Sequence, residues 1–437
     1  MQTHFTEAQL ANPGIARANR ILRACVHCGM CTATCPTYQI LGDELDSPRG
    51  RIYLIKQMLE GGKPADANTV KHVDRCLSCL ACMTTCPSGV HYMHLLDQAR
   101  AHIEATYRRP MGDRLLRWLL ARLLPYPARF RAAMIAAKFV RPFRQLVPDR
   151  RLRAMLDMAG APIAPPTPQD KPQCHEAAGP RRKRVVLLTG CAQKVIDPAI
   201  NPATIDLLTR QGVEVVIPEG EGCCGAIVHH MGLTSEALPM GRANIAAWIR
   251  EIDGHGLDAI IVNTSGCGTT IKDYGHLFAG QPEEADAVRV AALCKDVSEF
   301  LIDLGLPDRP TCNLTVASHA ACSLQHGQKV ITAPVTLLKK AGFRVLLPAE
   351  GHLCCGSAGT YNLLQPELSE KLRARKVGNI EALRPDAIAA GNIGCLKQIG
   401  SGTSIPVVHT VELLNWAYGG QRPDAIGVSN VPKETNS

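Results

Sequence analysis

The stretch CVHCGMCTATCP, residues 25–36, decides the fold of the first part of this chain, because it spaces four cysteines as Cys-x2-Cys-x2-Cys-x3-Cys-Pro. The stretch CLSCLACMTTCP, residues 76–87, repeats that spacing with different residues between the cysteines. A cubane [4Fe–4S] cluster needs four thiolates, of which a Cys-x2-Cys-x2-Cys loop supplies three while the fourth comes from elsewhere. The doubled motif therefore predicts two [4Fe–4S] clusters.

Two such runs predict reciprocal ligand sets, in which the last cysteine of each run binds the cluster of the other run. We expect the first cluster set to be Cys25, Cys28, Cys31 and Cys86. We expect the second cluster set to be Cys76, Cys79, Cys82 and Cys35. The alternative is structural zinc, which ordinarily uses paired Cys-x2-Cys knuckles rather than two four-cysteine runs that each end in Cys-Pro. Two clusters in one module indicate a role in passing single electrons.

Length and composition restrict the class of protein. A chain of 437 residues is too long for one ordinary core, and 46% apolar with 20% charged residues is typical of a globular protein. Its 19 cysteines are spread over a long chain, unlike those of a secreted disulfide scaffold. The opening MQTHFTEAQLANPG lacks the features of a signal peptide, and no apolar run of membrane-spanning length occurs. We therefore expect a reducing, cytoplasmic setting.

The net charge of +9 is concentrated in one segment. Residues 108–153 hold thirteen Lys and Arg against two acids, so they carry +11 and the remainder of the chain is close to neutral at −2. This distribution argues against a nucleic-acid partner and for a single basic patch. The patch is expected either to contact an anionic membrane surface or a protein partner, or to be a solvated helical face.

The order of motifs along the chain predicts five boundaries. Residues 1–100 form the ferredoxin-type domain, 101–157 a basic helical connector with short helices broken by prolines, and 158–184 a Pro-rich linker. Residues 185–305 and 311–420 form two related domains, and 421–437 form a C-terminal tail.

The two related domains are an internal repeat. Cys-Cys-Gly at residues 223–225 recurs at 354–356, an offset of 131 that also carries Cys191 onto Cys322. In each half, apolar runs such as RVVLLTGC and NLTVASHAAC alternate with helical stretches, which is typical of parallel strands buried on both faces. The predicted fold class is therefore α+β and α/β: a helical bis-[4Fe–4S] domain, a helical connector, and two small βαβαβ domains with cysteines on loops at strand ends.

Each half of the repeat gathers four cysteines that are candidates for a third and a fourth metal site. The first CCG set is Cys191, Cys223, Cys224 and Cys267, and the second CCG set is Cys322, Cys354, Cys355 and Cys395. Such S4 sets suit either an iron–sulfur cluster or zinc, and buried free cysteines are the remaining alternative.

Other histidines and cysteines of the chain are expected to have structural roles. Hydrogen-bonded or surface roles are favoured over metal ligation for His229, His230, His319, His352 and His409. The cysteines without a counterpart in the repeat are Cys174, Cys294 and Cys312, which are expected to be structural or incidental.

The chain has no nucleotide-binding motif of its own. No Gly-x-Gly-x-x-Gly follows a predicted strand, and no phosphate-binding loop is present. We therefore expect no flavin or nicotinamide on this chain, and no catalytic residue for two-electron chemistry. A dehydrogenase containing this chain would carry out that chemistry on a partner.

The chain resembles the iron–sulfur subunits of bacterial glycolate oxidase (glycolate dehydrogenase) through ILRACVHCGMCTATCPTYQILGDELDSPRGRIYLIKQMLEG, CPSGVHYMHLLD, GCAQ, GCCGA, SGCG, LQHGQK and HLCCGSAGTY. The resemblance implies FAD-carrying partner subunits that oxidise glycolate to glyoxylate, and also D-lactate. It further implies that electrons pass toward the quinone pool, on a protein peripherally associated with the cytoplasmic face of the inner membrane, and that this subunit is not catalytically competent alone.

Related proteins provide the alternatives. They are iron–sulfur subunits of lactate or anaerobic glycerol-3-phosphate dehydrogenases and thiol reductases of the heterodisulfide reductase kind. The wider CCG family ends each half in Cys-x2-Cys, whereas here GTT follows Cys267 and LKQ follows Cys395. This departure disfavours a five-cysteine noncubane cluster and disulfide chemistry. A zinc-bound CCG scaffold, with electrons carried only by the ferredoxin module, remains the alternative function for the repeat.

Overall fold

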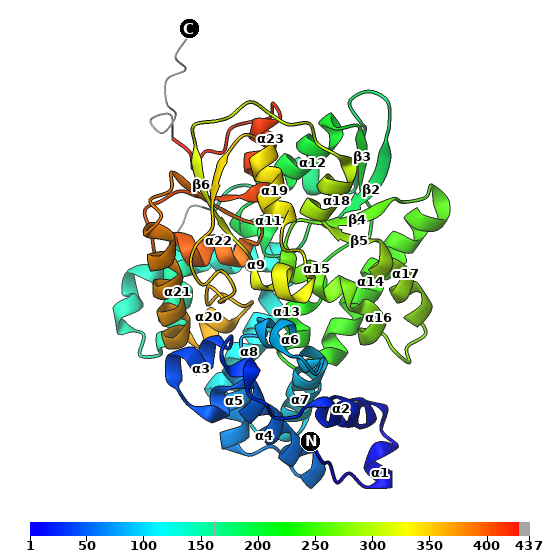
Figure 1. Cartoon of the computed structure of the whole chain (residues 1–437), viewed down its shortest axis with the longest axis vertical. Coiled ribbons are helices and arrows are strands. Elements are labelled where there is room, and N and C mark those ends of the chain that lie inside the picture. The colour runs from blue at the N-terminus through cyan, green and yellow to red at the C-terminus, as the bar shows by residue number, and fades with distance from the viewer. Residues whose placement is uncertain (161–162, 428–437) are drawn as a thin grey trace.

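The computed structural model describes residues 1–160 and 163–427. Figure 1 shows a helical N-terminal module at one end of the molecule and two sheets at the other, with the connector helices between them. The predicted tail, 421–437, is described only as far as residue 427, and its residues 428–437 lie outside the described part.

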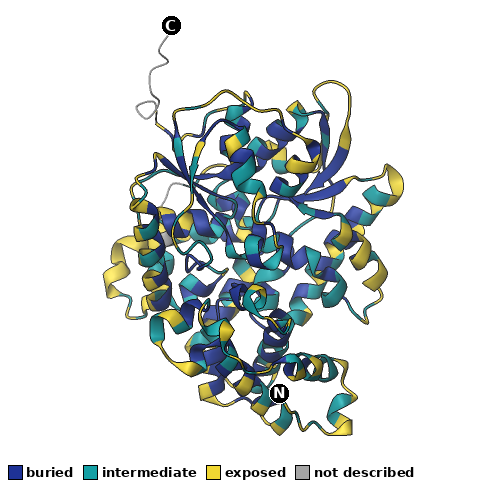
Figure 2. Cartoon of the chain, in the orientation of Figure 1, coloured by how far each residue is buried: buried dark blue, intermediate teal, exposed yellow. Residues whose placement is uncertain are grey.

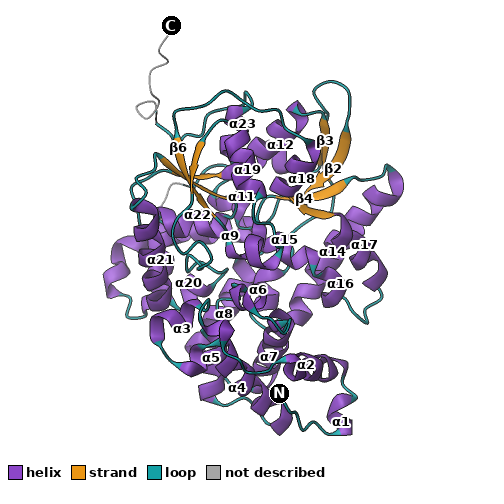
Figure 3. Cartoon of the chain, viewed as in Figure 1, coloured by secondary structure: helices purple, strands orange, loops and turns teal. Residues whose placement is uncertain are grey.

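The N-terminal module consists of helices and the loops between them, with no strand among its described residues (Figure 3). Its helices are α1 (Glu7–Leu10), α2 (Pro13–Ala24), α3 (Pro36–Leu41), α4 (Pro48–Gly61), α5 (Ala67–Asp74), α6 (Ala81–Thr85) and α7 (Tyr92–Thr106), with 3₁₀ turns η1 (Met30–Thr32) and η2 (Glu44–Asp46). Leu22, Ile55 and Leu95 are fully buried at its centre. Pro36 is the first residue of α3, where a proline costs no hydrogen bond and stops the helix from extending back over Cys35. We call residues 1–106 the ferredoxin module.

The connector consists of short helices, α8 (Met111–Leu123), α9 (Pro127–Val140), η3 (Arg141–Leu146) and α10 (Arg150–Met158). Buried ion pairs attach it to the ferredoxin module: Arg109 Nη1 and Arg117 Nη2 lie 2.6 Å and 3.0 Å from the Asp74 carboxylate. Part of the basic charge of this segment is therefore neutralised inside the protein, and it does not all form a surface patch.

The first CCG half is a five-stranded sheet in the order β1-β3-β2-β4-β5. Its strands are β1 (Gln173–His175), β2 (Lys183–Leu187), β3 (Val213–Ile217), β4 (Ala259–Val262) and β5 (Cys294–Asp296). All neighbours pair in parallel except β1, which pairs antiparallel with β3. Strand β1 lies in the segment predicted as a Pro-rich linker; its three residues are too few and too polar to show a strand pattern in the sequence.

Helices connect and cover these strands. They are η4 (Pro168–Asp170), α11 (Gln193–Ile196), α12 (Ile200–Arg210), α13 (Ala226–His230), α14 (Thr234–Gly254), α15 (Ser265–Lys272), α16 (Tyr274–Leu277), α17 (Glu284–Leu293) and α18 (Val297–Leu304).

The second CCG half is a four-stranded parallel sheet in the order β7-β6-β8-β9. Its strands are β6 (Thr315–His319), β7 (Arg344–Leu346), β8 (Ala387–Ala390) and β9 (Val407–His409). Its helices are the π-helical turn η5 (Ser323–Gly327), α19 (Ala333–Lys340), α20 (Tyr361–Leu364), α21 (Pro366–Glu381), α22 (Ile393–Gly400) and α23 (Thr410–Ala417). With β1 set aside, both sheets share the strand order second-first-third-fourth. The predicted fold class and the repeat are therefore confirmed.

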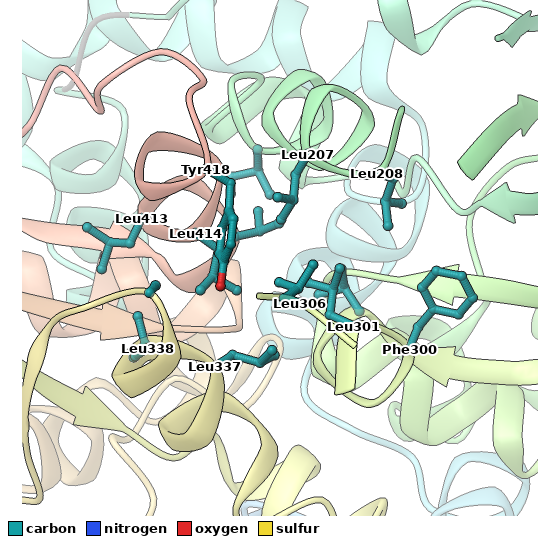
Figure 4. Packing of buried hydrophobic residues seen from close by; sticks show 14 of the residues in the cluster. Leu207, Leu208, Phe300, Leu301, Leu306, Leu337, Leu338, Leu413, Leu414 and Tyr418 are labelled. Atoms are coloured by element: carbon teal, nitrogen blue, oxygen red, sulfur yellow. The ribbon is translucent and has the colours of Figure 1, made fainter. Parts of the chain in front are cut away.

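The two halves share one hydrophobic core. Helices α12 and α18 from the first half meet α19 and α23 from the second between the sheets, and Figure 4 shows their leucines facing a common interior. Leu207, Leu301, Leu337 and Leu413 are all 0% exposed. The central strands are buried on both faces, as Figure 2 shows, and every residue of β4 and of β8 is buried, whereas the edge strands β1 and β7 are partly exposed. None of the helices in the described ranges is long and apolar enough to cross a membrane.

Candidate cluster and metal sites

The two ferredoxin motifs share an unusual backbone conformation. The third and fifth residues of each motif have positive φ: His27 (57°) and Gly29 (84°) in the first, Ser78 (53°) and Leu80 (63°) in the second. For a residue with a side chain this conformation costs about 1–2 kcal/mol. Three non-glycine residues are held in it, so both loops keep the same curled shape, which turns their cysteines toward a common centre.

Each predicted ferredoxin set lines its own cavity. One cavity is bounded by Cys35, Cys76, Cys79 and Cys82, which are the four members of the second cluster set. The other is bounded by the four members of the first cluster set, Cys25, Cys28, Cys31 and Cys86, together with Cys82. The fold thus brings the remote cysteine of each run to the opposite loop, as the reciprocal pairing requires.

The donor spacing fits clusters rather than single ions at these two cavities. Among the described residues, the groups of His, Cys, Asp and Glu with donor atoms mutually within 4.8 Å include none of the eight ferredoxin cysteines. Four thiolates that bind one zinc ion would lie about 3.8 Å apart, given Zn–S bonds of about 2.3 Å. The wider ring of sulfurs leaves room for a cluster between them.

A buried cation lies beside the second cluster set. The Arg51 side chain is 1% exposed, and its Nη1 lies 3.9 Å from Cys35 Sγ. The Nη2 atom of Arg51 donates to Thr37 Oγ1 (3.0 Å) and to Asp46 Oδ1 (3.2 Å). Burial alone lowers the pKa of Arg51, but the Cys76 and Cys35 thiolates and the Asp46 carboxylate hold that pKa above its usual value. Arg51 was not foreseen from the sequence, although a charged residue on the apolar stripe of α4 was the signal available.

The two ferredoxin sets differ in their access to solvent. All four cysteines of the second cluster set are buried, and Tyr92 Oη donates to Cys76 Sγ over 3.8 Å. In the first cluster set Cys28 is exposed and Cys31 and Cys86 are half-buried. The first set is therefore the one nearer the surface of this chain.

The first CCG set gathers where the strand order reverses, at the carboxyl ends of β2 and β4. Cys191 follows β2, Cys267 lies in the first turn of α15 after β4, and Cys223 Sγ lies 3.5 Å from Cys191 Sγ. Gly225, at φ 84°, starts α13 and allows Cys223 and Cys224 to turn inward together. Cys224 in turn contacts Cys267, so the four sulfurs form a continuous row.

The second CCG set repeats this arrangement at β6 and β8. Cys322 Sγ lies 3.8 Å from Cys354 Sγ, and Cys355 Sγ lies 3.3 Å from Cys395 Sγ. Lys376, 2% exposed, lies near Cys354, Cys355 and Cys395 and donates to the Glu350 carbonyl. Burial lowers the pKa of Lys376, and the cysteines act in the opposite direction.

His319 belongs with the second CCG set. It ends β6, is 5% exposed, and offers a ring nitrogen within 4.8 Å of the sulfurs of Cys355 and Cys395. Its Nε2 is buried without a hydrogen-bond partner in the described part of the chain. Burial, with Lys376 adding, lowers the pKa of His319 to about 3, so the ring is neutral.

The other singled-out histidines mostly have hydrogen-bonded roles. His229 and His230 lie 3.5 Å and 3.2 Å from the Asp97 carboxylate and join α13 to the ferredoxin module. His409 accepts from Val411 N at the start of α23 and lies 2.9 Å from the Asn263 carbonyl. His352 contributes its carbonyl oxygen to His326, 3.1 Å away. The ring contacts of His229, His230 and His409 agree with the expected hydrogen-bonded roles, whereas Nε2 of His319 is buried without such a partner in the described chain.

All eight CCG cysteines face one shared cavity of about 280 Å³. Residues of the second ferredoxin motif, including Cys76 and Leu77, line it as well. On one side Leu77 and Cys79 pack directly against Cys354 and Tyr361. The second cluster set therefore lies against the second CCG set, and the first cluster set lies on the far, more exposed side.

The remaining cysteines lie outside these sets. Cys174 is exposed on β1, Cys312 is half-buried beside the shared core, and Cys294 is buried on β5, where its Sγ lies 4.0 Å from the Gly268 carbonyl. None of the three lines the cavities described above.

These features define a class of protein, an oxidoreductase component with a two-cluster ferredoxin module joined to a duplicated cysteine-rich domain. Residues 21–90 match the family described as a 4Fe-4S dicluster domain. Residues 185–272 and 316–400 each match the family described as a cysteine-rich domain, CCG.

Curated relatives share nearly the whole chain. It is 42% identical over 425 residues to the glycolate oxidase iron–sulfur subunit of Escherichia coli (strain K12), covering 95% of this chain and 99% of that protein. It is 32% identical to the probable glycolate oxidase iron–sulfur subunit of Bacillus subtilis (strain 168), covering 90% and 94%. The chain therefore belongs to the family of glycolate oxidase iron–sulfur subunits.

More distant matches cover part of the chain or the fold alone. Lactate utilization protein A of Geobacillus kaustophilus (strain HTA426) is 30% identical and covers 53% of this chain and 98% of that protein. Among solved structures, a hypothetical protein from Helicobacter pylori matches with a TM-score of 0.53 at 10% identity, covering 96% of this chain and 75% of that one. This likeness concerns the fold only.

Proposed function

We propose that this chain is the electron-transfer subunit of a glycolate dehydrogenase complex, in which FAD-carrying partner subunits oxidise glycolate and electrons leave toward the quinone pool. The clusters held by the first and second cluster sets supply one-electron transfer when bound. The observation that carries the proposal is the reciprocal arrangement of eight cysteines around two cavities, one near the surface and one buried against the CCG halves.

The residues around the cavities perform distinct tasks in this proposal. The curled loops hold the thiolates, and Arg51 offsets negative charge at the buried site. The packing of Leu77 and Cys79 against Cys354 fixes the distance between the ferredoxin module and the second CCG set, with apolar side chains between them. Glycolate as the substrate rests on the family to which the chain belongs, and D-lactate or glycerol-3-phosphate are the alternatives.

The substrate claim is tested by purifying the complex under argon through a tag on this chain and assaying dye reduction with glycolate, D-lactate and glycerol-3-phosphate. We expect a co-purifying flavoprotein and glycolate-dependent activity, with none from the chain alone. Activity of the isolated chain, or a complex active only on another substrate, would contradict the proposal.

The electron-transfer claim is tested in the same complex by Cys28→Ser and Cys79→Ser. Each should remove dye reduction while substrate still reduces the flavin of the partner. Cys174→Ser is the matched control, because that cysteine is exposed and lines none of the cavities. Flavin that no longer reduces in the ligand variants would indicate a structural defect instead.

We further propose that the connector lies against the cytoplasmic face of the inner membrane. Ten of the seventeen large exposed hydrophobic residues in the described chain fall in this one segment: Met111, Leu115, Trp118, Tyr126, Ile135, Phe139, Val140, Phe143, Leu146 and Leu152. Phe139 and Phe143 are 77% and 62% exposed and are flanked by Lys138, Arg141 and Arg144. Exposed apolar residues beside cations are typical of a segment that lies in the membrane interface.

Flotation with vesicles of 30% anionic lipid tests this contact. The complex should float, and Phe139→Ser with Phe143→Ser should reduce binding at least about tenfold, given that each buried apolar side chain contributes about 1.5–3 kcal/mol and that about 1.4 kcal/mol is a factor of ten. Val288→Ser is the control, since Val288 is also exposed but lies on α17. Equal flotation of the wild type and all variants would contradict a membrane-binding role for this segment.

A zinc-bound scaffold is the second candidate function for the CCG halves. The pairs Cys322–Cys354 and Cys191–Cys223, with sulfurs 3.8 Å and 3.5 Å apart, approach the spacing of about 3.8 Å expected around tetrahedral zinc. In the described residues no three cysteines of either set lie mutually within 4.8 Å, so zinc would require the sulfurs to move closer together. Anaerobic metal analysis discriminates: about eight irons per chain with zinc supports the scaffold, whereas substantially more iron supports clusters in the CCG halves.

A further inference from the structure

The two CCG halves differ at one buried position beside their cysteines. The offset of 131 that superposes Cys191 on Cys322 places Leu188 on His319. Leu188 is 2% exposed and packs with Cys224 in an apolar cluster. His319 is 5% exposed at the same place in the second half. The repeat thus provides an internal comparison in which a leucine is sufficient for folding at this position.

The environment of His319 lacks what a buried structural histidine needs. A buried polar group without a hydrogen bond costs about 1–3 kcal/mol. His409, which is equally buried, uses both ring nitrogens, on Val411 N and the Asn263 carbonyl. In the described chain Nε2 of His319 has no such partner. The groups that the ring does approach are the sulfurs of Cys355 and Cys395.

The donor geometry fits a metal centre. The ring nitrogen and the two sulfurs lie mutually within 4.8 Å. Bonds of about 2.3 Å to sulfur and about 2.0 Å to nitrogen place tetrahedral ligands about 3.5–3.8 Å apart, so small adjustments close the site. Imidazole and thiolate are both ligands for iron–sulfur clusters and for zinc.

We propose that His319 is a ligand, together with Cys355 and Cys395, of the metal centre in the second CCG half. The two halves then hold centres of different chemistry, thiolate-only in the first half and thiolate with imidazole in the second. This inference rests on the proposal that the CCG sets bind metal.

The proposed ligands predict which of the two centres has the higher reduction potential. If both centres are iron–sulfur clusters, a centre with one neutral imidazole among four ligands carries one negative charge fewer than a centre with four thiolates, which raises its potential. Lys376, which is 2% exposed, lies beside the same set. As clusters, the centre in the second half would therefore be the more easily reduced of the two.

The experiment uses the complete complex, purified under argon with and without ¹⁵N-histidine, after metal analysis has shown iron or zinc in the CCG halves. For iron, pulsed EPR of the dithionite-reduced complex should show a hyperfine coupling to ¹⁴N without the label and to ¹⁵N with the label. For zinc, X-ray absorption at the zinc edge should show a nitrogen shell beside the sulfur shell. Either result supports the proposal, and cysteine-only coordination in the labelled wild-type complex overturns it.

Two variants then show which histidine supplies the nitrogen ligand. His319→Leu copies the residue of the first half, and it should abolish the histidine coupling or nitrogen shell completely. His352→Leu is the matched control, because His352 lies two residues from Cys354 without belonging to the group of His319, Cys355 and Cys395, and it should leave the signal unchanged. Loss of the signal in His352→Leu with retention in His319→Leu would overturn the assignment.

Failure of this inference is distinguishable from failure of the proposed function. If metal analysis finds the iron of two clusters and no metal in the CCG halves, His319 is not a ligand, while the two-cluster function stands. If the ferredoxin clusters are themselves absent from an active complex, the proposed function fails. Ferredoxin signals retained in His319→Leu show that the variant is folded.

Discussion

Arg51 and Cys35 lie side by side in the interior of the ferredoxin module, with Arg51 Nη1 3.9 Å from Cys35 Sγ and the guanidinium otherwise held by Thr37, Asp46 and the His72 carbonyl. A fixed positive charge so close to a thiolate favours the reduced form of whatever that thiolate binds. The sequence of α4 alone gives no indication of this contact, because Cys35 precedes Arg51 by sixteen residues.

Arg51→Met should lower the midpoint potential of the cluster held by the second cluster set. A unit charge at about 4 Å contributes about 4 kcal/mol at an effective dielectric of 20, and Asp46 cancels part of it, so a fall on the order of 100 mV is expected. Redox titration followed by EPR measures this potential. Arg51→Lys retains the charge and should shift the potential much less; equal shifts in both variants would show that packing, not charge, is responsible.

Air should destroy the cluster of the first set before that of the second. Cys28 is exposed, whereas Cys35, Cys76, Cys79 and Cys82 are all buried. Iron release during air exposure should therefore have two phases, and the faster phase should be missing in Cys28→Ser. A single phase shared by both clusters would contradict the difference in access.

Gly356→Ala should be more damaging than Gly225→Ala. Both glycines have positive φ, but a Cβ at Gly356 would lie 2.6 Å from the Ser369 carbonyl oxygen, against 3.1 Å from the Ala237 carbonyl oxygen for Gly225. The conformation alone costs about 1–2 kcal/mol for alanine, and the clash adds to it at Gly356. Thermal unfolding and metal retention measure the effect. Gly222→Ala is the control, since a Cβ there meets nothing within 4 Å.

The free energy of unfolding should fall as the pH is lowered, because His409 takes up a proton more readily in the unfolded chain than in the native one. Burial lowers the pKa of His409 to about 4, with the Asn263 carbonyl opposing, whereas the unfolded chain has a value of about 6.5. Below pH 6.5 the unfolded state therefore binds a proton that the native state does not, and native stability is lost as pH falls toward 4.

His409→Asn retains a helix-capping oxygen but cannot titrate. Between pH 7.5 and 5.5 the wild-type chain should lose about 1 kcal/mol more than this variant in urea unfolding. The pH slope of His255→Asn, which alters a histidine on the surface near the end of α14, should match the wild type. If the free energy of unfolding depends on pH equally in His409→Asn and the wild type, His409 is not the titrating group.

Much of the fold follows from local spacing and periodicity. The doubled cysteine runs, the repeat offset and the alternation of apolar runs with helices predict the helical module and the parallel strands, because such patterns concern neighbours in the chain. Strand β1 was not predicted, since its pairing with β3 is what makes Gln173–His175 a strand. The sets of cysteines were also accessible from the sequence, because strand ends in parallel sheets converge at one edge.

The surroundings of the cysteines were not accessible in the same way. The approach of Arg51 to Cys35 and the missing partner of His319 depend on how distant elements pack. Five histidines looked alike in the sequence, and the structure shows ring contacts for His229, His230 and His409 but a buried, unpartnered Nε2 for His319. That Cys79 lies against Cys354 depends on docking between modules more than 270 residues apart, which no local pattern encodes.

Because α12, α18, α19 and α23 contribute leucines to one common core, neither CCG half has a complete hydrophobic core of its own. Separated from its twin, each half would expose one wall of that interior to water, so the two should melt in a single cooperative transition. Damage to one half's centre and the folding of the other half are therefore thermodynamically linked.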